Sequence, residues 1–240
     1  MNYIKHHIAF ALFIFAFLTQ YLFNNTLQAQ RNIENFIKNA DKLNHELKEP
    51  EALAEFLKAY EADKNNEYIL WNISFLYSKI GFRLNEENKQ NEYFNLAKEF
   101  AELSLKANPE NDECNYVMAV AMGRIAEIAP VTERVSAARD IKKYGEKTLE
   151  INPNHALANH LLGKWHYRAA NLSWPEQIAA DLFFGGLGEA SNELSVNYFK
   201  KAIQIDPNDV LFYLDLAIEY EEIDEDTKAI EILNKAKGSR

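Results

Sequence analysis

The feature that most constrains the fold is a four-residue helix stop that recurs along the chain. Three copies contain proline, at residues 108–111, 152–155 and 206–209, and a fainter copy without proline spans residues 63–66. Proline cannot continue a helix, and it disfavours helix at the residue before it. Each stop follows an amphipathic stretch and precedes an aromatic-rich one. This regular stopping and restarting predicts an all-α chain of helical repeats.

The intervals between the stops predict which kind of repeat this is. Measured between Lys64, Pro109, Pro153 and Pro207, they are 45, 44 and 54 residues, whereas a tetratricopeptide repeat has about 34. About ten extra residues would lengthen the two helices of a repeat by one to two turns each. We therefore expect a tetratricopeptide-like superhelix of about four helix pairs with lengthened helices, opened by a half-copy. The pairs must stack, since no single pair can bury its apolar face alone.

The longest interval contains an insertion at residues 171–192. The segment 173–176 reads Ser-Trp-Pro-Glu, which is a helix start with a capping box and an early proline. We expect a short helix to about Phe184, ended by Gly185 and Gly186, with Ser191 capping the next helix.

Composition limits the classes of partner and site. The net charge of −10 disfavours a nucleic-acid partner. Cys114 is the one cysteine in the chain, so neither an internal disulfide nor a multi-thiolate zinc site can form. We expect it to be a small buried hydrophobe.

The first 29 residues differ from the rest of the chain. Lys5, two histidines and an apolar run from 8 to 18 precede a small residue, Ala29, at a plausible cleavage point. This predicts a signal peptide over 1–29 and a helical repeat domain over 30–240, hence an exported protein in the periplasm or outside the cell. Cleavage would change the net charge from −10 to −11, since the segment holds one lysine and no acid. The alternative is an uncleaved anchor, which would be the one point of membrane contact.

Residues 160–210 carry a family resemblance. The chain reads LGKWHY at 162–167, ANLSWPE at 170–176, LF at 182–183 and FKKA at 199–202 before Pro207. This pattern resembles the regulator of microtubule dynamics family, and the resemblance covers about residues 50–240. It implies an all-helical superhelical domain without known catalytic chemistry. Some members are linked to microtubules and others to lipid binding at membrane contacts; an exported protein would not meet microtubules.

The signature residues of that family are expected to be structural. They are Gly163, Trp165, Tyr167, Ser173 and Trp174. Tryptophan and tyrosine bury large areas and anchor helix junctions, so we expect them to fix the inserted helix against the array rather than to contact a ligand.

No arrangement for catalysis or metal binding is visible in the sequence. His155, His160 and His166 are five and six residues apart, whereas a zinc-binding helix needs histidines four residues apart. The glycine-rich segment 185–188 lacks the Lys-Ser or Lys-Thr of a phosphate-binding loop. We therefore expect no catalytic residue, no metal and no cofactor.

One row of residues does predict a binding site. Lys79, Arg124 and Arg168 occupy the same place in three successive first helices, near the concave groove of a tetratricopeptide array. Aromatic residues neighbour them in the alignment: Trp71, Phe75, Tyr116 and Tyr167. Together they predict an amphipathic groove whose basic end could bind a carboxylate or a phosphate. The alternative is that the cations satisfy helix C-terminal carbonyls or pair with the abundant acids.

The function expected from the sequence is a non-catalytic, exported scaffold that binds a protein or peptide partner in its concave groove. One alternative is a protein that binds or transfers a lipid or another amphipathic anionic ligand. A weaker alternative is an uncharacterised enzyme accessory. A closed apolar tunnel would favour lipid, and an open polar groove would favour a peptide.

Overall fold

A computed structural model of the chain describes residues 20, 27–28 and 30–238. Within these residues every regular element is a helix. The first spans residues 30–45, and it is followed by α2 (Glu49–Ala62), α3 (Glu67–Phe82), α4 (Glu87–Ala107), α5 (Asp112–Ile128), α6 (Val131–Ile151), α7 (Ala156–Ala170), α8 (Trp174–Phe184), α9 (Asn192–Ile205), α10 (Val210–Glu222) and α11 (Asp226–Ala236). The all-α fold expected from the recurring stops is confirmed.

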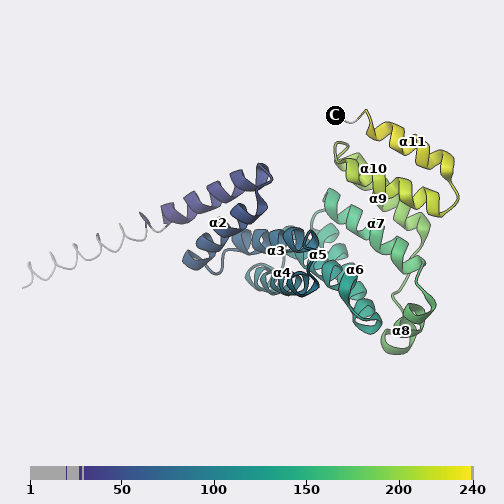
Figure 1. Ribbon diagram of the computed structural model, residues 1–240, viewed down its shortest axis with the longest axis horizontal. Helices are drawn as coiled ribbons and strands as arrows, with labels where there is room; N and C mark the ends of the chain where they lie inside the picture. Colours follow the sequence, from purple (N-terminus) through teal and green to yellow (C-terminus); the bar gives the residue numbers. More distant parts are fainter. Residues whose placement is uncertain (1–19, 21–26, 29, 239–240) are drawn as a thin grey trace, which may run out of the picture.

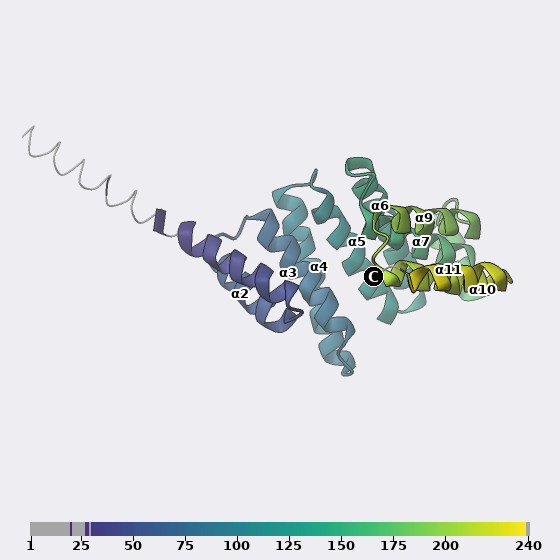
Figure 2. The same ribbon diagram turned by 90° about the horizontal axis from the view of Figure 1, so that it is seen from above.

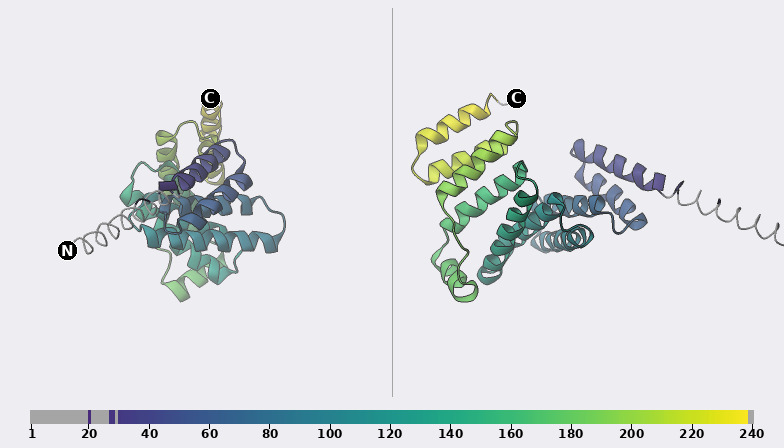
Figure 3. Two further views of the ribbon diagram at one scale, coloured as in Figure 1. Left: turned by 90° about the vertical axis from the view of Figure 1, so that its left-hand side faces the viewer. Right: turned by 180° about the vertical axis from the view of Figure 1, so that it is seen from behind.

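The helices form five pairs in the described part of the chain. They are residues 30–45 with α2, α3 with α4, α5 with α6, α7 with α9, and α10 with α11. The sequence predicted about four pairs and an opening half-copy with a partner helix at about residues 32–48; that partner is the helix at residues 30–45 and completes the fifth pair. Figure 1 shows the pairs stacked into a bent array, with α2 at one end and α11 at the other, and the views from above and behind show the same order (Figures 2 and 3).

The recurring stops are built by one set of hydrogen bonds. In the 108–111 turn, the amide of Asn108 donates to the carbonyl of Ser104 (2.9 Å), and the side chain of Asn108 accepts from the amide of Glu110 (3.2 Å). The side chain of Asn111 then caps α5 by accepting from the amide of Cys114 (3.1 Å). The other copies repeat this arrangement, with Asp63, Asn152 and Asp206 in the first place and Asn66, His155 and Asp209 as caps. The turn thus depends on its first and last side chains, so the copy without proline also forms it.

The extra residues between stops lengthen mainly the second helix of the middle pairs. Helices α4 and α6 have 21 residues each, whereas α2 and α9 have 14. Seven residues add about two helical turns. The first helices α3 and α5 have 16 and 17 residues, against 13 in α10, so they are longer by about one turn.

Small residues set the spacing within a pair, as the contact between α7 and α9 shows. A Cβ added at Gly163 would lie 2.9 Å from the ring of Phe199. The carbonyl of Gly163 also accepts a hydrogen bond from the hydroxyl of Ser195, at 2.9 Å. Only a glycine allows the two backbones to approach this closely.

The inserted helix α8 begins and ends as the sequence predicted. The capping box joins Ser173 and Glu176, and Gly185 ends the helix in a left-handed conformation with φ of +66°. Its buried side, Ala179 and Ala180, packs with Val135 of α6. Figure 1 shows α8 projecting from the outer side of the array.

The N-terminal prediction concerns residues that lie almost entirely outside the described part. The signal segment expected over 1–29 is described at residues 20, 27 and 28 only. Among the helices that the structure describes, none is long and apolar enough to cross a bilayer.

Candidate functional site

The candidate site is the surface formed by the first helix of each pair, here called the first-helix face. It consists of the exposed and half-buried side chains of α3, α5, α7 and α10. In Figure 1 these helices line the inner side of the bend, and α4 and α6 lie on its outer side. The residues that the sequence assigned to a binding groove all belong to α3, α5 and α7.

Aromatic rings cover the α3–α5 part of this face. Trp71 packs edge-on against Tyr68, with ring centroids 5.1 Å apart, and Phe75 lies 6.1 Å from Tyr116. Tyr116 in turn lies 4.7 Å from His155, at the start of α7. Trp71 and Phe75 pack against one core cluster that includes Tyr116, so the rings lie together, and their role in ligand binding stays a prediction. Tyr116 is almost fully buried, so it supports the surface and offers little area to a ligand.

Lys79 is part of a buried ion-pair group. Its Nζ lies 2.9 Å from Glu49 Oε1, and Arg83 contacts the other oxygen of the same carboxylate. Glu49 is 3% exposed. Burial opposes its ionisation, but the hydrogen bonds from Arg83 and Lys79 outweigh that effect and lower its pKa. Lys79 therefore has a structural partner, which matches the alternative that the sequence left open.

Arg124 is partly committed to neighbours. Its Nη1 lies 2.8 Å from Glu127 Oε1, and its guanidinium carbon lies 4.0 Å from the ring centre of Phe82. Its Nε has no acceptor among the described residues. The pair with Glu127 is half exposed and weak, because exposed ion pairs contribute little. Because Nε is buried, only the terminal nitrogens of the guanidinium can meet a carboxylate or phosphate, in exchange for Glu127.

Tyr167 and Arg168 form a second group on α7. Arg168 is exposed, and within the described part of the chain it has no ion pair. Tyr167 is half-buried, and its pKa is raised by burial and by a hydrogen bond to Glu222 of α10. No ring contact or ion pair of the described residues joins these two to the α3–α5 cluster. The three cations therefore lie on one face but do not form one compact cluster.

The contact between α7 and α10 extends the face to the last pair. His160 Nε2 lies 2.7 Å from Asp215 Oδ2, and Lys164 Nζ lies 3.2 Å from the same oxygen. Burial opposes the ionisation of Asp215, but His160 and Lys164 outweigh it and lower its pKa. The rings of Phe199 and Phe212 enclose His160. This group fixes α10 against α7.

The sequence reading missed the apolar part of the face on α10. Leu211, Leu214 and Ile218 are 47%, 46% and 45% exposed. The opposite side of α10 is also apolar and is buried in the core, so the helix is hydrophobic nearly all round. This pattern could have predicted an exposed apolar surface on α10, because a helix at the end of an array normally has one polar side.

The remaining reactive side chains have packing roles. His155 caps α7 by accepting from the amide of Ala158, and His166 stacks on Tyr198 with ring centroids 5.1 Å apart. Cys114 is fully buried, and burial raises its pKa to about 11. Among the described residues no group of His, Cys, Asp and Glu could hold a metal ion.

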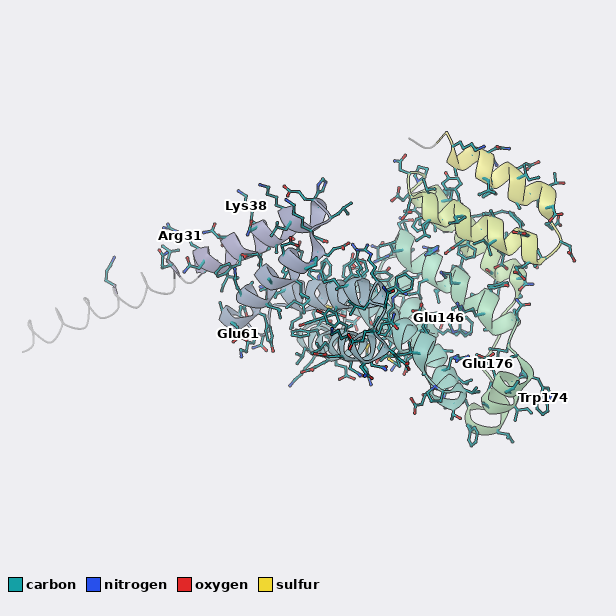
Figure 4. All side chains as sticks on the ribbon, viewed as in Figure 1. Arg31, Lys38, Glu61, Glu146, Trp174 and Glu176 are labelled. Atoms are coloured by element: carbon teal, nitrogen blue, oxygen red, sulfur yellow. The ribbon has the colours of Figure 1, made fainter. Side chains whose placement is uncertain are left out.

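The two tryptophans of the family signature differ in their environment. Trp165 is 4% exposed, and its Nε1 donates to the carbonyl of Ala138 in α6 at 2.6 Å. Trp174 is 77% exposed, and Figure 4 shows it at the outer edge of α8, directed away from the array. The packing role expected for Trp174 is therefore not seen; the buried side of α8 is formed by small alanines.

Two surface depressions lie between α5 and its neighbours α4 and α6. One of about 670 Å³ is lined by residues of α4, α5 and α6, including Lys143, Tyr144 and Lys147. Another of about 330 Å³ lies between Phe94, Ile125 and Glu133. Both open to solvent. Neither depression is a closed apolar tunnel.

Comparison with known sequences gives matches over most of the chain. The family model described as Regulator of microtubule dynamics protein 1-3 matches residues 36–239. Regulator of microtubule dynamics protein 1 of Pongo abelii is 27% identical over 184 residues, which are 76% of this chain and 58% of that protein. Protein 3 of Mus musculus is 29% identical over 138 residues, 58% of this chain and 29% of that protein. The chain therefore spans less than two thirds of the curated relatives it matches.

Solved structures support the same fold. The thermophilic tetratricopeptide protein TTC0263 of Thermus thermophilus superposes with a TM-score of 0.62 at 16% identity, covering 86% of this chain and 91% of that one. MamA from Desulfovibrio magneticus RS-1 gives a TM-score of 0.51 at 15% identity, covering 87% and 94%. At these identities the likeness concerns the fold alone, and it agrees with the tetratricopeptide-like superhelix predicted from the stops.

Proposed function

Because the chain belongs to the regulator of microtubule dynamics family, we propose that it is a non-catalytic tetratricopeptide-like scaffold that binds a segment of a protein partner on its first-helix face. The observation that carries the proposal is the cluster of rings and cations on α3 and α5. Trp71, Phe75 and Phe82 present aromatic surface, and Arg124 lies over Phe82 in a partly exposed pair with Glu127 that an incoming carboxylate can replace.

This combination suits a short peptide segment. Aromatic side chains contribute large contact areas with little loss of conformational freedom, and arginine binds carboxylates in a fixed geometry. A bent array of stacked helices also gives an extended surface, on which several residues of a partner can bind side by side. Neither of the two relatives described above has the name of an enzyme.

Export to the periplasm or the cell exterior is part of the proposal. It rests on the basic start, the apolar run and the small residue Ala29 in the first 29 residues. A role in microtubule dynamics is not proposed, since the name belongs to relatives of which this chain spans about half.

The partner-binding proposal is tested by capture from a cell-envelope extract on the immobilised protein. We compare the wild type with Arg124→Ala/Arg168→Ala, and we leave Lys79 intact because it neutralises Glu49. The matched control is Arg139→Ala/Lys201→Ala, which removes the same charge from two exposed cations of second helices.

We expect a partner retained in equal molar amount by the wild type and the control, and lost from the first-helix variant at unchanged far-UV circular dichroism. Equal retention by all three proteins would reject the first-helix face as the binding site.

A second candidate is an amphipathic anionic ligand such as a lipid, favoured by the cation–ring contacts of Lys79 with Phe75 and of Arg124 with Phe82. Mass spectrometry of organic extracts of the purified protein distinguishes this candidate from a peptide partner. If the wild type co-purifies with lipid in equal molar amount and Arg124→Ala/Arg168→Ala does not, the ligand is a lipid and the peptide proposal is wrong.

A further inference from the structure

The last pair of the array exposes an apolar stripe. Leu211, Leu214 and Ile218 follow each other at intervals of three and four residues, so they lie on one side of α10. Val210 beside them is 52% exposed. Aliphatic side chains in such a row are unusual on a free surface, because a contiguous exposed apolar patch generally marks an interaction site.

The stripe belongs to the first-helix face. Asp215, between Leu214 and Ile218 in the helix, pairs with His160 and Lys164 of α7. Glu222, one turn after Ile218, bonds to Tyr167. The stripe therefore continues the surface that carries the aromatic cluster at the other end of the array.

The surroundings of the stripe are strongly acidic. Residues 206–238 contain ten Asp or Glu and three Lys, a net charge of −7 in a chain whose total is −10. Asp206, Glu221 and Glu222 are exposed near the two ends of α10. By contrast, the α3–α5 part of the face presents aromatic rings, and its cations Lys79, Arg83 and Arg124 are paired with Glu49 or Glu127. The face is thus aromatic with paired charges towards one end, and aliphatic with an excess of acids at the other.

This charge distribution decides between the occupants that an apolar stripe could have. A second copy of the chain would bring another −7 against the first, and like charges across an interface cost several kcal/mol. An anionic lipid head group would meet the same repulsion. A segment with apolar side chains and basic flanks meets complementary charge.

We propose that the α10 stripe is the docking subsite for a basic amphipathic segment of a partner protein, with apolar residues three and four apart and Lys or Arg beside them. This deepens the scaffold proposal and rests on it. The partner lies along the face in one direction only, because its basic end pairs with the acids around α10.

The test uses three fluorescent 16-residue peptides and the full chain. One peptide has leucines at intervals of three and four with lysines between them; the second has the same leucines with glutamates; the third keeps the lysines and replaces leucine by serine. Fluorescence anisotropy is measured at about 0.15 M salt, where non-specific charge attraction is screened.

We expect the Leu/Lys peptide to bind at least about tenfold more tightly than either of the others. Leu214→Ser/Ile218→Ser should weaken its binding by about tenfold or more, and Glu221→Lys should weaken it and reduce its salt dependence. The control Ile230→Ser/Leu233→Ser changes two exposed aliphatic residues of α11, off the face, and should leave binding unchanged.

A preference for the Leu/Glu peptide, or equal binding to the α10 and α11 variants, would overturn the inference. So would self-association in analytical ultracentrifugation that Leu214→Ser/Ile218→Ser abolishes, since the stripe would then belong to a second copy. If these tests fail while partner capture still depends on Arg124 and Arg168, the scaffold proposal stands without this subsite. If capture depends on neither set, the scaffold proposal fails as well.

Discussion

Single carboxylates with little exposure connect neighbouring helices, as at Glu49, Asp215 and Glu219. Glu49 and Asp215 each have two cationic or histidine partners. Glu219 is 2% exposed, contacts only the hydroxyl of Ser195 at 2.9 Å, and its Oε1 has no partner among the described residues. Burial raises the pKa of Glu219 to about 7. In its neutral form it can donate to Ser195, whose own hydroxyl then donates to Gly163.

The raised pKa of Glu219 predicts a pH-dependent stability. In the unfolded chain Glu219 ionises near its ordinary pKa of 4.5, whereas the folded chain holds it neutral to about 7. The contribution of Glu219 to the free energy of unfolding therefore falls as the pH rises from about 4.5 to about 7 and is constant above that, while the lowered pKa of His166 acts in the opposite direction below about 6.5. Glu219→Gln should remove this loss and raise the free energy of unfolding at pH 8 by about 3 kcal/mol. Urea unfolding followed by circular dichroism at pH 4.5, 6 and 8 measures it.

The control for this prediction is Glu221→Gln, an exposed neighbour on the same helix, which should change the free energy of unfolding by less than about 0.5 kcal/mol at each pH. A difference between the wild type and Glu219→Gln that does not change between pH 4.5 and 8 would contradict the assignment.

The two signature tryptophans should respond differently to the same change. Trp165→Phe removes the hydrogen bond to Ala138 and part of a buried ring, and it should lower the free energy of unfolding by about 1–3 kcal/mol. Trp174→Phe, at a ring that is 77% exposed, should change it by less than about 0.5 kcal/mol. Denaturant midpoints of the two variants make the comparison, and a larger loss for Trp174→Phe would show that α8 packs differently from the structure.

At the scale of helices, glycine decides how closely two of them approach. Gly163 in α7 leaves 2.9 Å between an added Cβ and the Phe199 ring, whereas an added Cβ at Gly123 in α5 would have Ile141 as its nearest neighbour at 4.0 Å. Both glycines lie inside helices, so the two positions form a matched pair.

Alanine substitutions at these positions should have opposite signs. Gly163→Ala should lower the free energy of unfolding by about 1–3 kcal/mol, because α7 and α9 must move apart. Gly123→Ala should raise it by about 0.5–1 kcal/mol, because alanine favours the helix and finds space. Thermal and urea unfolding check both. Stabilisation by Gly163→Ala would mean that the α7–α9 contact is loose.

At the scale of the whole molecule, α8 is a side insertion into a stack of five pairs. Helices α7 and α9 pack directly on each other, and Asn171 Nδ2 donates to Asn192 Oδ1 at 2.8 Å across the base of the insertion. Helix α8 contacts the array through α6, with an ion pair from Arg134 to Glu176. A stacked array is stabilised by contacts between neighbouring helix pairs, and α8 does not belong to any of these pairs.

Replacing residues 173–190 by a short Gly-Ser linker should therefore leave the array folded. We expect an unchanged helical signal per remaining residue, one cooperative transition and a midpoint lowered by a few degrees, as about 1 kcal/mol shifts it by roughly 2–4 °C in a chain of this size. Circular dichroism during heating and small-angle scattering measure these quantities. Loss of the cooperative transition would show that α8 is part of the stack.

The stops, the helix lengths and the capping box of α8 could be predicted because each depends on a few adjacent residues. An Asn or Asp at the first place of a turn and a cap at its last place act within four residues, and the sequence displays them directly. The repeat alignment also placed Trp71 and Phe75 next to Tyr116, and these rings pack on one core cluster. These features set the fold and the surface on which a partner could bind.

The partners of individual side chains were decided by the tertiary structure. Lys79 meets Glu49, thirty residues earlier, and Tyr167 meets Glu222 of the last pair. Trp174 lies in the solvent, and the aliphatic stripe of α10 remains uncovered. Burial and ion pairing depend on how neighbouring pairs stack, which is a sum of many contacts between distant residues. The sequence alone thus determined a tetratricopeptide-like array, while its stacking decided which charges and apolar residues are free to bind.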